Sequence, residues 1–125
     1  MTKNFYRNKI MKLDILNDIN EIELLEDNWD GYGAIKVNIE ILNTLKLFIN
    51  SLEEKHLEKV YDIYPNPNGT ISIEFNFNKI YMLSIEIGET KFSYFIKSEG
   101  VYINGSDFIE NIELVKLKDI IETLK

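Results

Sequence analysis

The amino-acid sequence predicts an α+β fold with two N-terminal helices, a four- to five-stranded antiparallel meander and a C-terminal helix, with the helices on one sheet face. Two patterns support this prediction: apolar residues recur at helical spacing before residue 55, and they alternate with polar residues from residue 60 to about 103. With 125 residues, 45% of them hydrophobic, the chain is long enough for one core and too short for two. We therefore expect a single domain over residues 1–125.

The first helix is expected to run from Ile10 to Leu25, because Ile15, Ile19 and Ile22 recur at helical spacing. The preceding residues 1–9 are polar, and we expect them to form a flexible arm.

A second helix is expected after Asn38, whose side chain is suited to an N-cap, and should continue to Glu54 or His56. Its apolar stripe makes it the expected central core helix and consists of Ile41, Leu45, Phe48, Ile49 and Leu52. His56 is the only histidine, and at the end of a helix it is expected to be a capping residue rather than a catalyst.

The segment between these helices, residues 26–34, reads Glu-Asp-Asn-Trp-Asp-Gly-Tyr-Gly-Ala and holds the only tryptophan. Gly31 and Gly33 permit positive φ angles, and Asp and Asn side chains bond to nearby backbone, so we expect a compact turn of defined shape. In one interpretation Trp29 and Tyr32 pack at the edge of the core, and the turn fixes the angle between two helices. In the other, the turn is a contact surface or the rim of a pocket.

The sheet is expected to begin with residues 60–64, which end at the breaker cluster of residues 65–69. Three apolar rows then follow: Ile71, Ile73, Phe75 and Phe77; Tyr81, Leu83, Ile85 and Ile87; and Phe92, Tyr94 and Ile96. We expect Phe77 to pair with Tyr81 and Ile87 to pair with Phe92, because these registers keep all three rows on one face.

The opposite sheet face is expected to carry Tyr61, Met82 and Phe95 among polar residues, which makes it more apolar than a solvated face requires. These three side chains form the predicted face of a possible homodimer.

Residues 101–103 are expected to be a short last strand, closed by a turn at Asn104-Gly105. The helical pattern after it has Ser106 or Asp107 as its N-cap, although residues 113–116 also fit an irregular or extended segment. We place the C-terminal helix at residues 117–124.

The net charge of −7 is concentrated, because residues 13–35 contain seven acidic residues and no Lys or Arg. Such a segment repels nucleic acid and anionic membrane, so it favours a basic protein partner or serves solubility alone. The residues expected to bind a partner are Asp14, Asp18, Glu21, Asp27, Trp29, Asp30 and Tyr32.

The absence of cysteine excludes disulfides and thiolate chemistry and fits a reducing cytoplasm, and no stretch has the apolar length of a signal peptide or membrane span. We therefore expect a cytoplasmic protein.

No catalytic motif or phosphate loop occurs, and a calcium loop beginning at Glu26 fails because its twelfth residue is Val37. We expect no metal, no cofactor and no enzymatic activity. The alternatives are a small hydrolase that uses His56 or carboxylates such as Glu74 and Glu86, and a structural homodimer without another ligand.

Residues 29–34 read Trp-Asp-Gly-Tyr-Gly-Ala, and residues 69–75 read Gly-Thr-Ile-Ser-Ile-Glu-Phe. Over residues 24–90 the chain resembles a loosely defined group of short, uncharacterised bacterial and phage-associated proteins. These proteins carry the first motif and a later Gly-x-Ile-x-Leu-Glu-Trp strand, in which Ile73 and Phe75 here replace leucine and tryptophan. The resemblance implies no activity, but it is in keeping with an antitoxin, immunity or counter-defence role.

Overall fold

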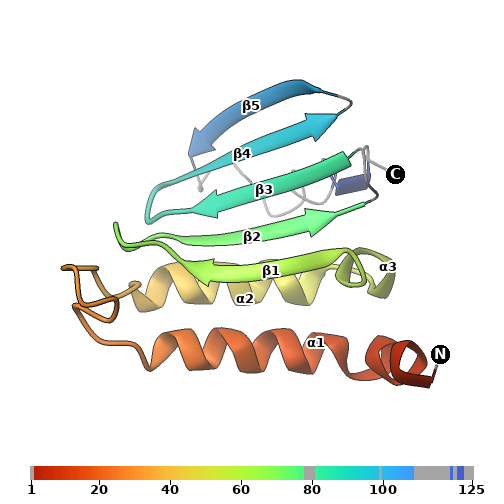
Figure 1. Ribbon diagram of the computed structural model, residues 1–125, viewed down its shortest axis with the longest axis horizontal. Helices are drawn as coiled ribbons and strands as arrows, with labels where there is room; N and C mark the ends of the chain where they lie inside the picture. Colours follow the sequence, from red (N-terminus) through yellow and green to blue (C-terminus); the bar gives the residue numbers. More distant parts are fainter. Residues whose placement is uncertain (1, 78–80, 99, 109–118, 120, 123–125) are drawn as a thin grey trace.

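The structure is a computed structural model that describes residues 2–77, 81–98, 100–108, 119, 121 and 122 (Figure 1). Its helices are α1 (Thr2–Glu23), α2 (Ile39–Ser51) and α3 (Glu54–Leu57). Its strands are β1 (Val60–Pro65), β2 (Ile71–Asn76), β3 (Tyr81–Ile87), β4 (Lys91–Ser98) and β5 (Val101–Phe108). The predicted α+β class and antiparallel meander are confirmed. In the part of the chain described, none of the helices has the length and apolarity needed to cross a membrane.

The five strands follow one another in the order β1-β2-β3-β4-β5, and each pairs with its neighbour in antiparallel orientation. Both predicted registers are confirmed. Ile87 pairs with Phe92, and the Phe77 amide donates to the Tyr81 carbonyl at 3.1 Å. A one-residue slip would have moved Ser84 and Glu86 into the core, so the cost of burying polar groups selects the observed register.

The core lies between the apolar sheet face and the helices. α2 is the central helix, as predicted, and the Phe48 ring meets Phe75 edge-on with 6.4 Å between ring centroids. Figure 1 shows α1 and α2 running in opposite directions, and α1 also contacts β1 at the edge of the sheet. Ile121, which has helical backbone, is fully buried in the same core.

The helix boundaries differ from the prediction, most clearly at the start of α1 and the end of α2. α1 begins at Thr2, so residues 2–9 are helical rather than a flexible arm, because an established helix adds further residues at little cost. α2 ends at Ser51, whose Oγ donates to the Phe48 carbonyl at 2.6 Å and so competes with the helical backbone bonds. Leu52 then has extended backbone with ψ 145°, and the chain restarts as α3.

His56 is buried, with 1% of its surface exposed, and lies in α3 rather than at the end of α2. Its Nδ1 accepts a hydrogen bond from the Glu53 amide at 3.3 Å, so the ring proton is on Nε2, which donates to Glu122 at 2.6 Å. The histidine is a capping residue, as predicted, but it caps the N-terminus of a different helix. Both ring nitrogens are already bonded.

The expected turn at Asn104-Gly105 is wrong, because β5 runs straight through it from Val101 to Phe108. Gly105 pairs with Tyr94, and a Cβ atom at this position would stand 2.6 Å from Tyr94 Cζ. The glycine is therefore needed for the packing of a ring on the neighbouring strand. An N-cap at Ser106 or Asp107 is wrong for the same reason. Residues 109–118 lie outside the described residues, and the helical backbone of Asp119, Ile121 and Glu122 agrees with the helix placed at 117–124.

Candidate functional site

Within the segment that joins α1 to α2, residues 27–36 have a tightly defined backbone, and we call them the junction loop. Asn28, Gly31 and Gly33 have positive φ angles of 66°, 80° and 88°. Glycine adopts this conformation without steric cost, and asparagine tolerates it better than most residues. The predicted compact turn is therefore present, and Asn28 contributes to it along with the two glycines.

Side chains of the loop hold its backbone in place. Asp30 Oδ1 accepts hydrogen bonds from the Tyr32 amide at 2.8 Å and the Ala34 amide at 3.1 Å. Asn28 Oδ1 accepts from the Gly33 amide at 2.7 Å, and its own amide donates to the Ala34 carbonyl at 2.6 Å. Of the residues expected to bind a partner, Asp30 is thus placed to shape the loop.

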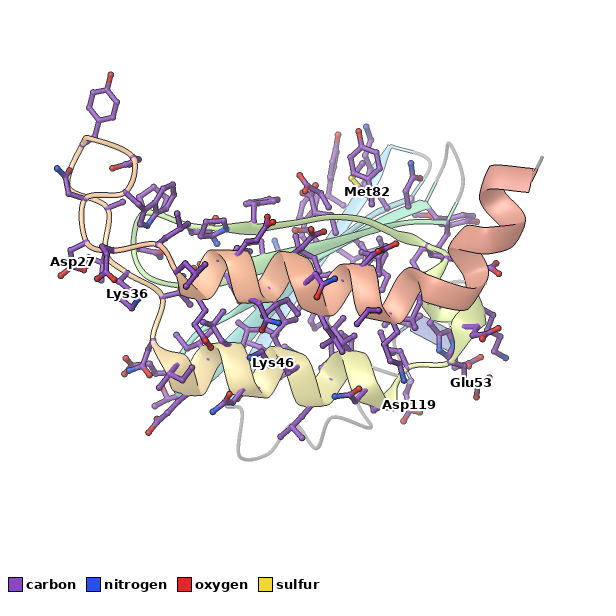
Figure 2. The ribbon with its side chains drawn as sticks, turned by 90° about the horizontal axis from the view of Figure 1, so that it is seen from below. Asp27, Lys36, Lys46, Glu53, Met82 and Asp119 are labelled. Carbon is purple, nitrogen blue, oxygen red and sulfur yellow. The ribbon has the colours of Figure 1, made fainter. Side chains whose placement is uncertain are left out.

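The two ends of the junction loop are joined to each other, and Lys36 attaches them to the end of α1. Asp27 Oδ1 accepts from the Lys36 amide at 2.9 Å, and Figure 2 shows both residues at the C-terminal end of α1. Lys36 Nζ donates to the carbonyls of Glu23 and Leu25, at 2.9 Å each. A cation at this end of a helix satisfies otherwise unpaired carbonyls and opposes the helix dipole.

The loop is also attached to the turn between β1 and β2. The Ile35 amide donates to the Pro67 carbonyl at 2.8 Å. The Ile35 side chain packs against Gly69, where an added Cβ atom would lie 3.3 Å from Ile35 Cγ2. The junction loop is therefore supported by the sheet as well as by α1.

The two aromatic residues of the loop have different environments. Trp29 is half-buried, and its Nε1 donates to the Ile35 carbonyl at 3.3 Å. Tyr32 is 93% exposed. The interpretation that both rings pack at the core edge is therefore wrong for Tyr32. The fold itself does not bury this ring, so the junction loop presents it to the solvent.

Three of the predicted partner residues, Asp14, Asp18 and Glu21, are exposed on one side of α1, and we call them the acidic ridge. They lie at positions i, i+4 and i+7, and span about 10 Å along the helix axis. None of the three forms an ion pair with another described side chain. By contrast, Glu23 pairs with Lys46 of α2 at 3.5 Å, and Figure 2 shows Lys46 beside α1.

Tyr61 does not lie on the face where the sequence placed it. The register between β1 and β2 shifts between Val60 and Asp62, so Tyr61 falls in a bulge. It lines a small hollow of about 90 Å³ with Asp14 and Asp18 of α1. The expectation that it shares a face with Met82 and Phe95 is wrong.

Met82 and Phe95 do lie on the open sheet face, with 36% and 39% of their surfaces exposed. They occupy diagonal positions, because Met82 pairs with Lys97 and Ser84 pairs with Phe95. The Phe95 ring lies 5.3 Å from the ring of Tyr102 on β5, measured between centroids.

The open sheet face also carries a cavity of about 540 Å³, which we call the sheet hollow. Its lining includes Tyr64, Ser72, Ser84, Glu86, Phe95 and Asn104. The alternating polar positions of β2 and β3 were a signal for this lining. Its outer walls were missed, because Tyr64 depends on the bulge in β1 and Asn104 was expected in a turn.

Burial raises the pKa of Tyr64 above 10.0, and the carboxylate of Glu74, which accepts the tyrosine hydroxyl at 3.1 Å, raises it further. Tyr64 is therefore a neutral hydrogen-bond donor at physiological pH. Among the residues that the structure describes, no three acidic or histidine side chains gather in a way that could hold a metal ion.

Comparisons of the chain with family models, with curated proteins and with solved structures give no match. The acidic ridge presents three exposed carboxylates, and the junction loop presents the exposed ring of Tyr32.

Proposed function

We propose that the protein is a small non-enzymatic binding module, which engages a basic partner protein through the acidic ridge and the junction loop. The observation that carries this proposal is Tyr32, whose ring is 93% exposed on a loop held by hydrogen bonds from Asp30 and Asn28. Tyrosine provides a large contact area with few rotatable bonds, and it is frequent among the residues that dominate binding energy.

The rigidity of the junction loop supports the same proposal. Binding by a flexible loop loses backbone freedom, which reduces the affinity that its contacts provide. Here the bond between Asp27 and Lys36 already joins the two ends of the loop, and the bond from Ile35 to Pro67 attaches the loop to the β1–β2 turn. Mainly side-chain freedom of Tyr32 is then lost when a partner binds.

The acidic ridge contributes electrostatic steering in this proposal. Its three carboxylates, Asp14, Asp18 and Glu21, are exposed and lie on the helix that leads into the loop. Exposed charges of this kind mainly raise the association rate with an oppositely charged partner, and salt screens them. The biological role that we propose is that of an antitoxin, immunity or counter-defence protein in the cytoplasm.

Affinity capture from a lysate of the native host tests the proposal. The bait is the tagged wild-type protein, and the comparison is Tyr32→Ala, with Tyr102→Ala as the matched control because that ring is also exposed, at 59%. We expect the wild type and the control to retain the same basic protein in about 0.1 M salt and to lose most of it in about 1 M salt. We expect Tyr32→Ala to bind about thirtyfold more weakly, which corresponds to about 2 kcal/mol. Capture of the same proteins by Tyr32→Ala, or of none by the wild type, contradicts the proposal.

Once a partner has been identified, a second experiment distinguishes the contribution of the acidic ridge to binding from that of the junction loop. Neutralising the ridge with Asp14→Asn, Asp18→Asn and Glu21→Gln should slow association and leave dissociation nearly unchanged, whereas Tyr32→Ala should speed dissociation. Surface plasmon resonance measures both rates. An unchanged association rate in the neutralised variant would remove the acidic ridge from the binding surface.

A further inference from the structure

The sheet hollow lies on the face opposite the helices and takes no part in the function proposed above. Its volume of about 540 Å³ falls within the range of about 300 to 1,000 Å³ that is typical of small-molecule sites. Its floor is formed by side chains of three neighbouring strands, where Ser72 pairs with Glu86 and Glu86 pairs with Ser93. The site is therefore built on the sheet rather than on loops alone.

One wall of the hollow is held by a hydrogen-bond network. Glu86 Oε2 accepts from Thr70 Oγ1 at 2.5 Å and from Asn68 Nδ2 at 3.5 Å. Asn66 Nδ2 donates to Ser72 Oγ at 2.8 Å and to Thr70 Oγ1 at 3.0 Å. These bonds connect the β1–β2 turn to the strands and fix the orientation of the Glu86 carboxylate.

The hollow is also lined by polar side chains that do not belong to this hydrogen-bond network. Ser84, Ser93 and Asn104 line the cavity and form no side-chain hydrogen bond with another described residue. Each hydroxyl can donate and accept, and the amide does both. A ligand that enters here therefore meets oriented acceptors on one side and adaptable groups on the other.

The lining selects among ligand classes. The Glu86 carboxylate repels anions, and no Lys or Arg is among the described residues that line the hollow. An ammonium or guanidinium group offers donors alone, so a ligand that carries only such groups would leave the N–H and O–H donors of Asn104, Ser84 and Ser93 without acceptors. A neutral ligand rich in hydroxyl groups matches the mixed set, because every hydroxyl both donates and accepts.

An aromatic wall adds a second criterion. Phe95 borders the hollow, and its partly exposed ring lies 5.3 Å from the Tyr102 ring, at an angle of 31° between the planes. The face of a sugar ring that carries C–H groups packs on such an aromatic surface, while its hydroxyls reach polar groups at the side. We propose that the sheet hollow binds a neutral saccharide, with one sugar ring against Phe95 and its hydroxyls bonded to Glu86, Ser84 and Asn104.

NMR titration of the ¹⁵N-labelled protein tests this proposal. The probes are glucose, galactose, N-acetylglucosamine, maltotriose and cellotriose, each at about 10 mM, which nearly saturates a site with a Kd of about 1 mM. At least one of them should shift the backbone amide signals of Ser84, Ser93 and Asn104 in a saturable manner. Arginine and inorganic phosphate at the same concentration should leave those signals in place.

Three variants make the test specific. Phe95→Ala should weaken binding about tenfold, which corresponds to about 1.4 kcal/mol. Ser84→Ala should weaken binding a few-fold. Tyr32 lies in the junction loop, so Tyr32→Ala should bind the saccharide as the wild type does. Failure of the saccharide proposal is therefore distinguishable from failure of the proposed protein-binding function. A Ser84→Ala spectrum that otherwise matches the wild type shows that the fold is retained.

Three outcomes would overturn the proposal. The first is that none of the five saccharides shifts these signals. The second is that arginine or phosphate shifts them instead, which would assign the hollow to an ion. The third is that the same signals shift when the protein alone is concentrated, because a second copy of the chain would then occupy the face that carries Met82 and Phe95.

Discussion

Replacing Asp30 by alanine tests whether this carboxylate holds the junction loop rather than contacting a partner. The substitution removes the acceptor of two backbone bonds, from the exposed Tyr32 amide and the part-buried Ala34 amide. Water replaces the first at little cost. A bond from a part-buried amide to a charged acceptor contributes about 1.5–3 kcal/mol. We therefore expect Asp30→Ala to lower the free energy of unfolding by about 2 kcal/mol, and Asp30→Asn, which keeps a neutral acceptor, by about 1 kcal/mol.

Urea unfolding followed by far-UV circular dichroism measures these differences, and hydrogen exchange of the Ala34 amide reports on the loop itself. The matched control is Glu21→Ala, an exposed carboxylate on α1, which should change stability by less than about 0.5 kcal/mol. If Asp30→Ala is as stable as this control and its Ala34 amide exchanges at the wild-type rate, Asp30 does not hold the junction loop. Asp30 would then belong to the binding surface.

Three further predictions concern the loop, the sheet and the sheet hollow. Trp29→Ala should lower the free energy of unfolding, measured in urea, by about 2 kcal/mol, because the indole is only half-buried. A decrease above about 4 kcal/mol would instead indicate a fully buried indole. Gly105→Ala should lower stability by about 1–3 kcal/mol because its Cβ meets Tyr94 at 2.6 Å, and a Tyr94→Ala background should reduce that loss; equal losses in both backgrounds contradict the clash. The raised pKa of Tyr64 stabilises the fold below pH 10.0, and this contribution is lost as the pH rises through the folded-state pKa. Between about pH 9 and pH 11 the wild type should therefore lose more stability than Tyr64→Phe, and parallel pH profiles would contradict this.

The order and register of the strands were predictable because a single face carries the apolar rows. Moving β3 by one residue would bury Ser84 and Glu86, so the sequence permits essentially one pairing. Gly105 was misread for the opposite reason: Asn-Gly is a strong local turn signal, and the ring that requires the glycine belongs to Tyr94, on another strand. The end of α2 at Ser51 was also missed, because the competing bond from its hydroxyl becomes visible only in three dimensions.

The candidate site was predictable to a similar extent. Two glycines and three Asp or Asn residues indicated a turn of defined shape, but they did not show which backbone amides those side chains would bind. The same local pattern fits a buried Tyr32 as well as an exposed one. Lys36 could not be connected to α1, because its ammonium group bonds to the carbonyl of Glu23, which is 13 residues earlier in the chain.

The central claim is that the junction loop is preorganised before any partner binds, and backbone ¹⁵N relaxation of the free protein tests it most directly. The amides of Gly33 and Ala34 are bonded to Asn28 and Asp30, so their order parameters should be about 0.85, as in the rigid backbone of α2. Tyr32 should show the same value for its amide while its ring remains mobile. Order parameters below about 0.6 across residues 28–34 would contradict the account, since a loop of that mobility cannot hold Tyr32 ready for a partner.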